Sequence, residues 1–139
     1  MSSGAPRTEA VLPLLHPRAW QVASALLVAS VVVACLVPSG TLDVPQPVGI
    51  DKVEHFVAYA ALATWFGGLY PRLRYPLIAA CLALLGLVIE VLQQLMGLGR
   101  EADPRDMMAN LAGIFAGLAL GVAVAGGWAP RLESWLARR

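Results

Sequence analysis

Apolar residues gather in four runs of about twenty residues, separated by stretches rich in charge, proline and glycine. Twenty helical residues extend ~30 Å, the thickness of the hydrocarbon core of a bilayer. The short connection 71–76 makes the second and third runs antiparallel neighbours. We therefore predict an all-α fold, an integral membrane four-helix bundle over 19–128, with spans at about 19–37, 51–70, 77–96 and 106–128.

The two ends of the chain differ from these runs. Residues 1–18 contain three prolines that prevent a long helix, and their leucines beside arginines suit an amphipathic segment at the membrane surface. Pro130 is expected to end the fourth span. Residues 129–139 alternate arginine with Leu132, Trp135 and Leu136, a pattern typical of an interfacial helix in a basic tail.

Basic residues divide unevenly if the four runs alternate across a membrane. Segments on the cytoplasmic side of a membrane carry the excess of Lys and Arg. We therefore expect both termini to be cytoplasmic. Seven basic residues fall on the side of the termini and three on the other, respectively Arg7, Arg18, Arg72, Arg74, Arg131, Arg138, Arg139 and Lys52, Arg100, Arg105.

Composition narrows the function classes. Charged residues make up 14% of the chain and apolar residues 58%, whereas a soluble domain carries about a quarter charged residues, so a globular enzyme core is not expected. The chain has no basic stripe for nucleic acid. Cys35 and Cys81 lie in apolar runs without metal-ligand spacing. Arg18, the apolar run after it and Val32-Val33-Ala34-Cys35 resemble a bacterial lipoprotein signal, but we expect the run to remain a permanent helix.

The third run contains a single acid, Glu90. A carboxylate at the centre of a membrane costs about 2.5–3.5 kcal/mol, so this one needs a compensating partner. At ~100° per residue, the polar and glycine positions of the run fall on one narrow stripe, which must face protein, water or a headgroup. That stripe consists of Gly86, Glu90, Gln93, Gln94 and Gly97.

Three of the predicted helices carry polar residues towards the extracytoplasmic face. Asp51, His55 and Tyr59 repeat at i, i+4 and i+8, and Asp51 is placed to cap its helix. Asp106 and Asn110 form a stripe that continues as Gly113, Gly117 and Gly121, the small-residue pattern that lets membrane helices approach closely. We take His55 and Glu90 as candidate catalytic residues, and as candidate ligand-binding residues Asp51, Lys52, Tyr59, Gln93, Arg100, Asp106 and Asn110.

These residues form three motif blocks, which occur in order over 50–121. They read Asp51-Lys52-x2-His55-Phe56-x2-Tyr59, then Glu90-x2-Gln93, then Arg100-x5-Asp106-x3-Asn110-x2-Gly113-x3-Gly117. The pattern resembles the VanZ-like membrane proteins, a family named for a protein that raises tolerance to the glycopeptide teicoplanin. The resemblance implies a small, multi-pass protein of the bacterial cytoplasmic (inner) membrane tied to the cell envelope, and it implies no particular reaction.

The favoured hypothesis is an extracytoplasmic pocket that binds the headgroup of a membrane lipid or of a lipid-linked cell-wall precursor. Arg100, Lys52 and Arg105 would meet phosphate. A second hypothesis is a membrane enzyme in which Glu90 or Asp51 orients His55 as an acid–base group. A third is a non-catalytic subunit or assembly factor, in a homo-oligomer or larger complex, with the polar stripes holding the bundle together. No cofactor is expected, and one histidine with carboxylates is a poor zinc set, so no metal site is predicted.

Overall fold

The computed structural model describes residues 11–37, 49–97 and 103–139, and within this part of the chain all regular structure is helical. The all-α prediction is confirmed at this level. In chain order the elements are α1 (Pro17–Leu36), α2 (Ile50–Leu69), the 3₁₀ turn η1 (Arg72–Arg74), α3 (Tyr75–Met96), α4 (Pro104–Leu120), the π-helical turn η2 (Gly121–Ala125) and α5 (Trp128–Leu136).

Three helical segments of the described chain are long and apolar enough to cross a membrane. They are Pro17–Leu36, Arg72–Met96 and Pro104–Ala123. The twenty residues of α2 give it the same length, but its first turns contain Asp51, Lys52 and Glu54, which lower its hydropathy. Three of the four long helices are therefore suited to cross a membrane, and α2 lies outside that set.

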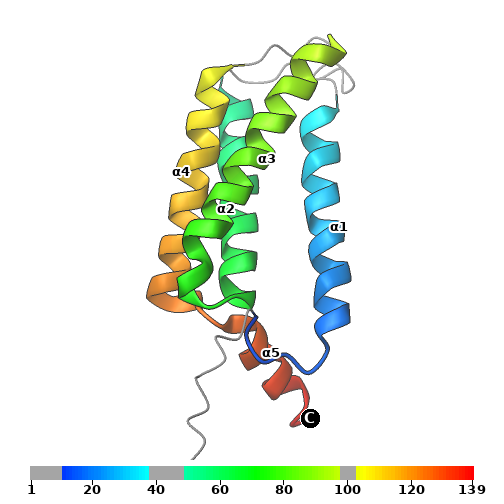
Figure 1. Cartoon of the computed structure of the whole chain (residues 1–139), viewed down its shortest axis with the longest axis vertical. Helices are drawn as coiled ribbons and strands as arrows, with labels where there is room; N and C mark the ends of the chain where they lie inside the picture. The colour runs from blue at the N-terminus through cyan, green and yellow to red at the C-terminus, as the bar shows by residue number, and fades with distance from the viewer. Residues whose placement is uncertain (1–10, 38–48, 98–102) are drawn as a thin grey trace, which may run out of the picture.

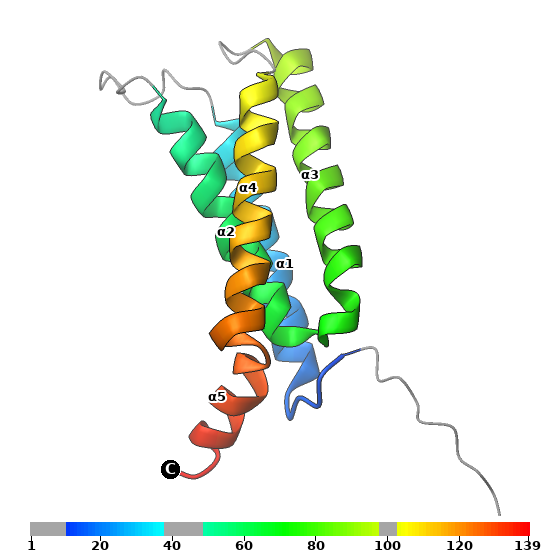
Figure 2. The same ribbon diagram turned by 90° about the vertical axis from the view of Figure 1, so that its left-hand side faces the viewer.

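The four long helices lie side by side along the long axis of the molecule, and α5 lies at the end where α1 begins (Figures 1 and 2). The core is built by α2, α3 and α4, whose fully buried side chains include Tyr59, Leu62, Ile89 and Ile114. Only Cys35 of α1 is buried. The helix α1 is thus attached to a three-helix core rather than inserted into it.

Glycines determine the closest helix contact, between α2 and α4. A Cβ on Gly113 would lie 2.3 Å from the backbone oxygen of Phe56, and one on Gly117 would lie 2.4 Å from that of Ala60. No side chain fits at these distances, so the two backbones touch only because both positions are glycine. The predicted glycine stripe is confirmed, and its neighbour is α2. The third member, Gly121, instead faces the Tyr75 hydroxyl.

Two helix starts differ from prediction in instructive ways. The N-cap of α2 is Gly49, with φ +85°, and no side chain caps this helix; Asp51 lies inside the first turn, so its predicted role as a cap is wrong. The fourth helix starts two residues early because Asp103 caps it, accepting a hydrogen bond from the Arg105 N–H, and Pro104 follows where a missing N–H costs nothing.

The end of the fourth helix is also placed differently. The regular helix ends at Leu120, η2 extends it to Ala125, and a turn at Gly126–Gly127 precedes α5. Gly127 has φ +70°, a conformation that favours glycine. The prediction that Pro130 ends the fourth span is therefore wrong. Pro130 lies in the first turn of α5, where it needs no N–H donor.

Charges separate along the bundle. We call the end formed by α5 and the start of α1 the basic end, and the opposite end the acidic end. At the basic end Glu133 is buried, with Trp20, Trp65 and Trp128 packed beside one another at centroid distances of 5.3–5.5 Å. The described arginines of the basic end are Arg18, Arg72, Arg74, Arg131, Arg138 and Arg139.

Candidate functional site

At the acidic end, polar side chains from three helices meet inside the apolar core. We call this group the acidic-end cluster. Each member is at most 7% exposed. Such burial is costly for polar groups unless they find partners, so their contacts decide what the cluster can do. It consists of His55 and Tyr59 from α2, Glu90 from α3, and Asp106 and Asn110 from α4.

Asn110 sets the orientation of the imidazole. The Nδ1 of His55 lies 3.0 Å from Asn110 Oδ1. An amide oxygen only accepts, so with the Asn110 amide in this orientation Nδ1 is the donor, and a neutral ring then keeps its lone pair on Nε2. Nε2 points towards Asp106, whose Oδ2 is 3.7 Å away. The ring thus presents a proton acceptor or metal ligand to the carboxylates.

Lys52 lies at the rim of the cluster among three carboxylates. Its ammonium nitrogen is 2.7 Å from Asp51, 2.9 Å from Asp103 and 3.0 Å from Asp106. The hydrogen bond from Lys52, helped by the Arg105 N–H, holds the pKa of Asp103 below its usual value. Lys52 is therefore engaged within the protein, and the predicted contact between this ammonium group and a phosphate has no free donor to start from.

Among the described residues, Glu90 makes one hydrogen bond at the acidic end. Its Oε2 accepts from the backbone N–H of Asp103 at 3.2 Å. The side chain is 6% exposed, and Oε1 has no hydrogen-bond partner among the described residues. The acid therefore points into the protein, as its predicted cost in lipid requires, but it is only half satisfied there.

Two further buried polar atoms share this condition. Tyr59 Oη and Asn110 Nδ2 have no hydrogen-bond partner within the described chain. Both face Gly86 of α3, because a Cβ built there would lie 2.9 Å from Asn110 Nδ2 and 3.2 Å from Tyr59 Oη. Glycine at position 86 gives these two groups their room. All three unpaired buried polar atoms of the described side chains thus belong to this cluster, so a partner for them is to be sought there.

The remaining predicted residues lie elsewhere. Gln93 is buried but turns to α1, where its Nε2 donates to the Cys35 carbonyl at 2.8 Å, so it joins two helices instead of lining the cluster. Gln94 is exposed, so the predicted polar stripe is narrower than expected. Asp51 reaches only the rim. Arg100 lies outside the described residues.

The cluster contains a set of potential metal ligands. One ligand atom each from His55, Glu90 and Asp106 lies within 4.8 Å of the others, and all three residues are buried. The same set suits proton transfer, since an imidazole between two carboxylates can accept and return a proton. Sequence spacing could not reveal it, because the three residues come from three helices.

Asp103, which the sequence places among the polar residues of this end, is absent from the predicted list of site residues. This residue caps α4, binds Lys52 and brings its own N–H to Glu90. The signal was present in Asp103-Pro104, an N-cap residue followed by a proline at the first helical position. It identifies a helix start, but it does not identify the partners of the cap.

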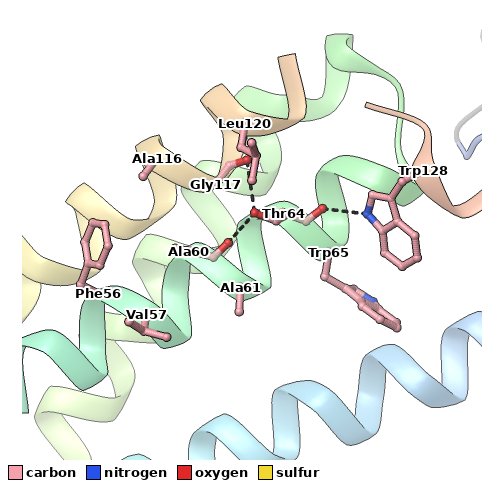
Figure 3. A pocket seen from close by; sticks show the side chains of 10 residues that line it. All are labelled: Phe56, Val57, Ala60, Ala61, Thr64, Trp65, Ala116, Gly117, Leu120 and Trp128. Carbon is pink, nitrogen blue, oxygen red and sulfur yellow. Dashed lines mark hydrogen bonds between the residues drawn. The ribbon is translucent and has the colours of Figure 1, made fainter. Parts of the chain in front are cut away.

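Away from the acidic-end cluster, a surface pocket of about 480 Å³ lies between α2 and α4 (Figure 3). Its walls are mainly apolar. The polar groups drawn there pair with one another: Thr64 Oγ1 donates to Ala60 O at 2.8 Å, and Trp128 Nε1 donates to Thr64 O at 3.2 Å. This depression carries no unpaired polar group in the described chain and suggests no chemistry.

The chain was also compared with known proteins. No protein-family model, no curated protein and no solved structure matches it. The resemblance to VanZ-like proteins therefore remains a prediction that depends on the three motif blocks.

Proposed function

We propose that this chain is a VanZ-like, four-span protein of a bacterial cytoplasmic membrane, in which α2 crosses the membrane together with α1, α3 and α4. The charge separation supports this arrangement, since six described arginines gather at the basic end with both α5 and the start of α1. By the positive-inside tendency, that end is cytoplasmic and the acidic end is extracytoplasmic. The three indole rings at the basic end suit a membrane interface.

In this proposal the acidic end binds the headgroup of a lipid or of a lipid-linked cell-envelope precursor. One observation carries it: a groove of about 440 Å³ between α1 and α2 ends at His55, a member of the acidic-end cluster. Its walls include Val31, Ala34 and Ala58, which suit an acyl chain, and Glu54 and His55, which suit a polar head. An apolar groove with a polar end matches the two-part chemistry of a lipid.

The headgroup chemistry follows from the charges at this end. Lys52 is already paired with carboxylates, and Arg105 is exposed. The side chains left to bind a ligand at this end are therefore mainly hydrogen-bond acceptors and uncharged hydrogen-bond donors. Such groups suit the hydroxyls of a sugar, amides and amines. Phosphate contacts would come from Arg105 and from Arg100. Occupancy at the outer leaflet would change what a glycopeptide such as teicoplanin meets, which is how tolerance would arise.

Copurified lipids test this proposal. Wild-type protein extracted in mild detergent is expected to retain a defined lipid, identified by mass spectrometry, whereas Ala58→Leu narrows the groove and reduces that lipid severalfold. Ala112→Leu, on the exposed face of α4, is the matched control and should retain it. Arg100→Ala tests the phosphate contact. Equal lipid profiles in all four folded proteins would contradict the proposal.

A second candidate is an enzyme acting on such a lipid, favoured by the grouping of His55 and Glu90 within 4.8 Å. His55 would serve as the base and Glu90 would complete the acid–base pair. His55→Gln discriminates between the two functions. Loss of turnover of a lipid-linked substrate with lipid retention unchanged would favour catalysis, and full teicoplanin tolerance in cells expressing His55→Gln would remove it.

A further inference from the structure

We infer that the acidic-end cluster is a binding site for one divalent metal ion, of the kind that accepts both imidazole and carboxylate ligands. The ligands are His55, Glu90 and Asp106, whose ligand atoms lie within 4.8 Å of one another. Each comes from a different helix, so an ion bound there would join α2, α3 and α4.

The ligands are oriented in the way that metal ligands are. Each has one atom engaged by a neighbour and another left over. His55 Nδ1 pairs with Asn110 and leaves Nε2; Glu90 Oε2 accepts from Asp103 and leaves Oε1. Asp106 Oδ1 accepts from Lys52, and its Oδ2 faces the imidazole. Partners of this kind orient metal ligands, and neutral histidine usually donates its other N–H to an oxygen.

The unpaired atoms and the charge decide what kind of occupant fits. Glu90 Oε1 is buried without a partner, so the space it faces suits a group that attracts a carboxylate. Among the described residues, the cluster and its rim hold four carboxylates, those of Asp51, Glu90, Asp103 and Asp106, against the ammonium group of Lys52 and the exposed guanidinium of Arg105 near Asp103. An anion is repelled here, and a water molecule supplies hydrogen bonds but no charge. A cation supplies the missing charge.

The ligand set also narrows the metal. Carboxylates alone favour Mg²⁺ or Ca²⁺, whereas an added imidazole favours Mn²⁺, Fe²⁺ or Zn²⁺. Ligand atoms around a tetrahedral ion at ~2.1 Å lie about 3.4 Å apart, so ligand atoms that now lie up to 4.8 Å apart must approach by up to about 1.4 Å on binding. The sequence predicted no metal site, and it is the tertiary structure that brings these three ligands together.

The metal site stands whether or not a lipid binds. A further role, in which the ion supplies the positive charge that attracts a headgroup phosphate, rests on the proposed function. The two ideas fail separately. If the protein binds metal but retains no lipid, the proposed function is contradicted and the metal site is not. If it retains a lipid but binds no metal, the metal site is contradicted and the proposed function is not.

The test uses full-length protein without a polyhistidine tag, treated with EDTA and titrated in detergent with ZnCl₂ and MnCl₂. We expect one ion per chain, and Co²⁺ should give an absorption spectrum of nitrogen and oxygen coordination. Glu90→Gln, Asp106→Asn and His55→Gln should each weaken binding more than 100-fold, a loss of about 2.7 kcal/mol at 1.36 kcal/mol per tenfold. Asn110→Ala, which releases the imidazole, should weaken it about 10–100-fold.

Two controls make the result decisive. Glu54→Gln removes an exposed carboxylate from the same end and should change affinity less than about threefold. His16→Gln removes the other histidine, at the basic end. If wild-type protein binds neither ion with a Kd below about 100 μM, the inference is overturned. A proton shared between the carboxylates would then take the place of the metal ion. Binding that survives all three ligand substitutions also overturns it.

Discussion

Two buried glutamates at opposite ends of this protein differ in how completely they are paired. Glu133, 7% exposed, accepts hydrogen bonds from the Leu15 N–H, from the His16 N–H at 2.9 Å and from the Trp20 indole N–H at 2.9 Å. Glu90, 6% exposed, accepts one, at 3.2 Å, and has an oxygen without a partner among the described residues. The two carboxylates are thus about equally buried, but Glu133 accepts more hydrogen bonds than Glu90 does among the described residues.

The difference separates a structural acid from a functional one. Glu133 accepts hydrogen bonds from donors at the start of α1, where the helix dipole also favours a negative charge. Contacts within the folded protein therefore account for this buried charge without any ligand. Glu90 gains too little from its surroundings to explain its burial. An ionisable residue buried among membrane helices without full pairing points to a functional site, which is the basis of the metal-site inference above.

The largest expected effect comes from removing the paired acid. Glu133→Leu leaves three partly buried N–H donors without their charged acceptor, and we expect a loss of about 4 kcal/mol in the free energy of unfolding. Glu90→Leu, the matched change, should leave the stability of metal-free protein nearly unchanged or raise it. Tryptophan fluorescence during denaturant unfolding in detergent measures both. Equal losses in the two variants would erase the distinction.

A second change tests whether the acidic end depends on the close contact between α2 and α4. Gly113→Ala places a methyl group 2.3 Å from the Phe56 carbonyl oxygen, so the helices must separate, at a cost of about 3 kcal/mol. We expect metal binding to be lost while the fluorescence of the indole group at the basic end is retained. Ala112→Val, on the exposed face of the same helix, is the control. Simultaneous loss of both ends would show that they are not independent.

Replacing each glutamate by the isosteric glutamine is expected to change the stability of the metal-free protein in opposite directions. Glu90→Gln removes an incompletely paired buried charge and is expected to stabilise metal-free protein by about 1 kcal/mol while abolishing its stabilisation by Zn²⁺ or Mn²⁺. Glu133→Gln weakens three charge-assisted hydrogen bonds and should destabilise it. Thermal unfolding with and without metal distinguishes these outcomes. Destabilisation by Glu90→Gln in the absence of metal would mean that Glu90 is structural.

The smallest effect is a pH dependence at the basic end. Burial raises the pKa of Glu133, but the N–H groups of Leu15, Trp20 and His16 together outweigh it and hold the pKa below the ordinary value of 4.5. A lowered folded-state pKa means that stability is present above pH 4.5 and is lost as the pH falls from there through the folded value. Glu133→Gln should flatten this part of the profile. An unchanged acid slope in that variant would assign the dependence to other carboxylates.

Much of the molecule follows from the order of residues alone. Run length and apolar composition predict the long helices to within about two residues, except at the end of the fourth, because helix length and hydropathy are local properties. The glycine spacing predicts a close contact, and i, i+4 spacing correctly places His55 over Tyr59 and Asp106 over Asn110. Charge predicts which end of each helix is polar. These statements need only one helix at a time.

Only the tertiary structure decides which faces meet. It turns Gln93 towards α1 and leaves Gln94 exposed, it surrounds Lys52 with three carboxylates, and it joins Glu133 to Leu15, 118 residues earlier in the chain. Helix periodicity defines a face but not its neighbour, so these partners could not be read from spacing. The contrast between a satisfied and an unsatisfied acid is therefore a property of packing, since both are single glutamates in the sequence.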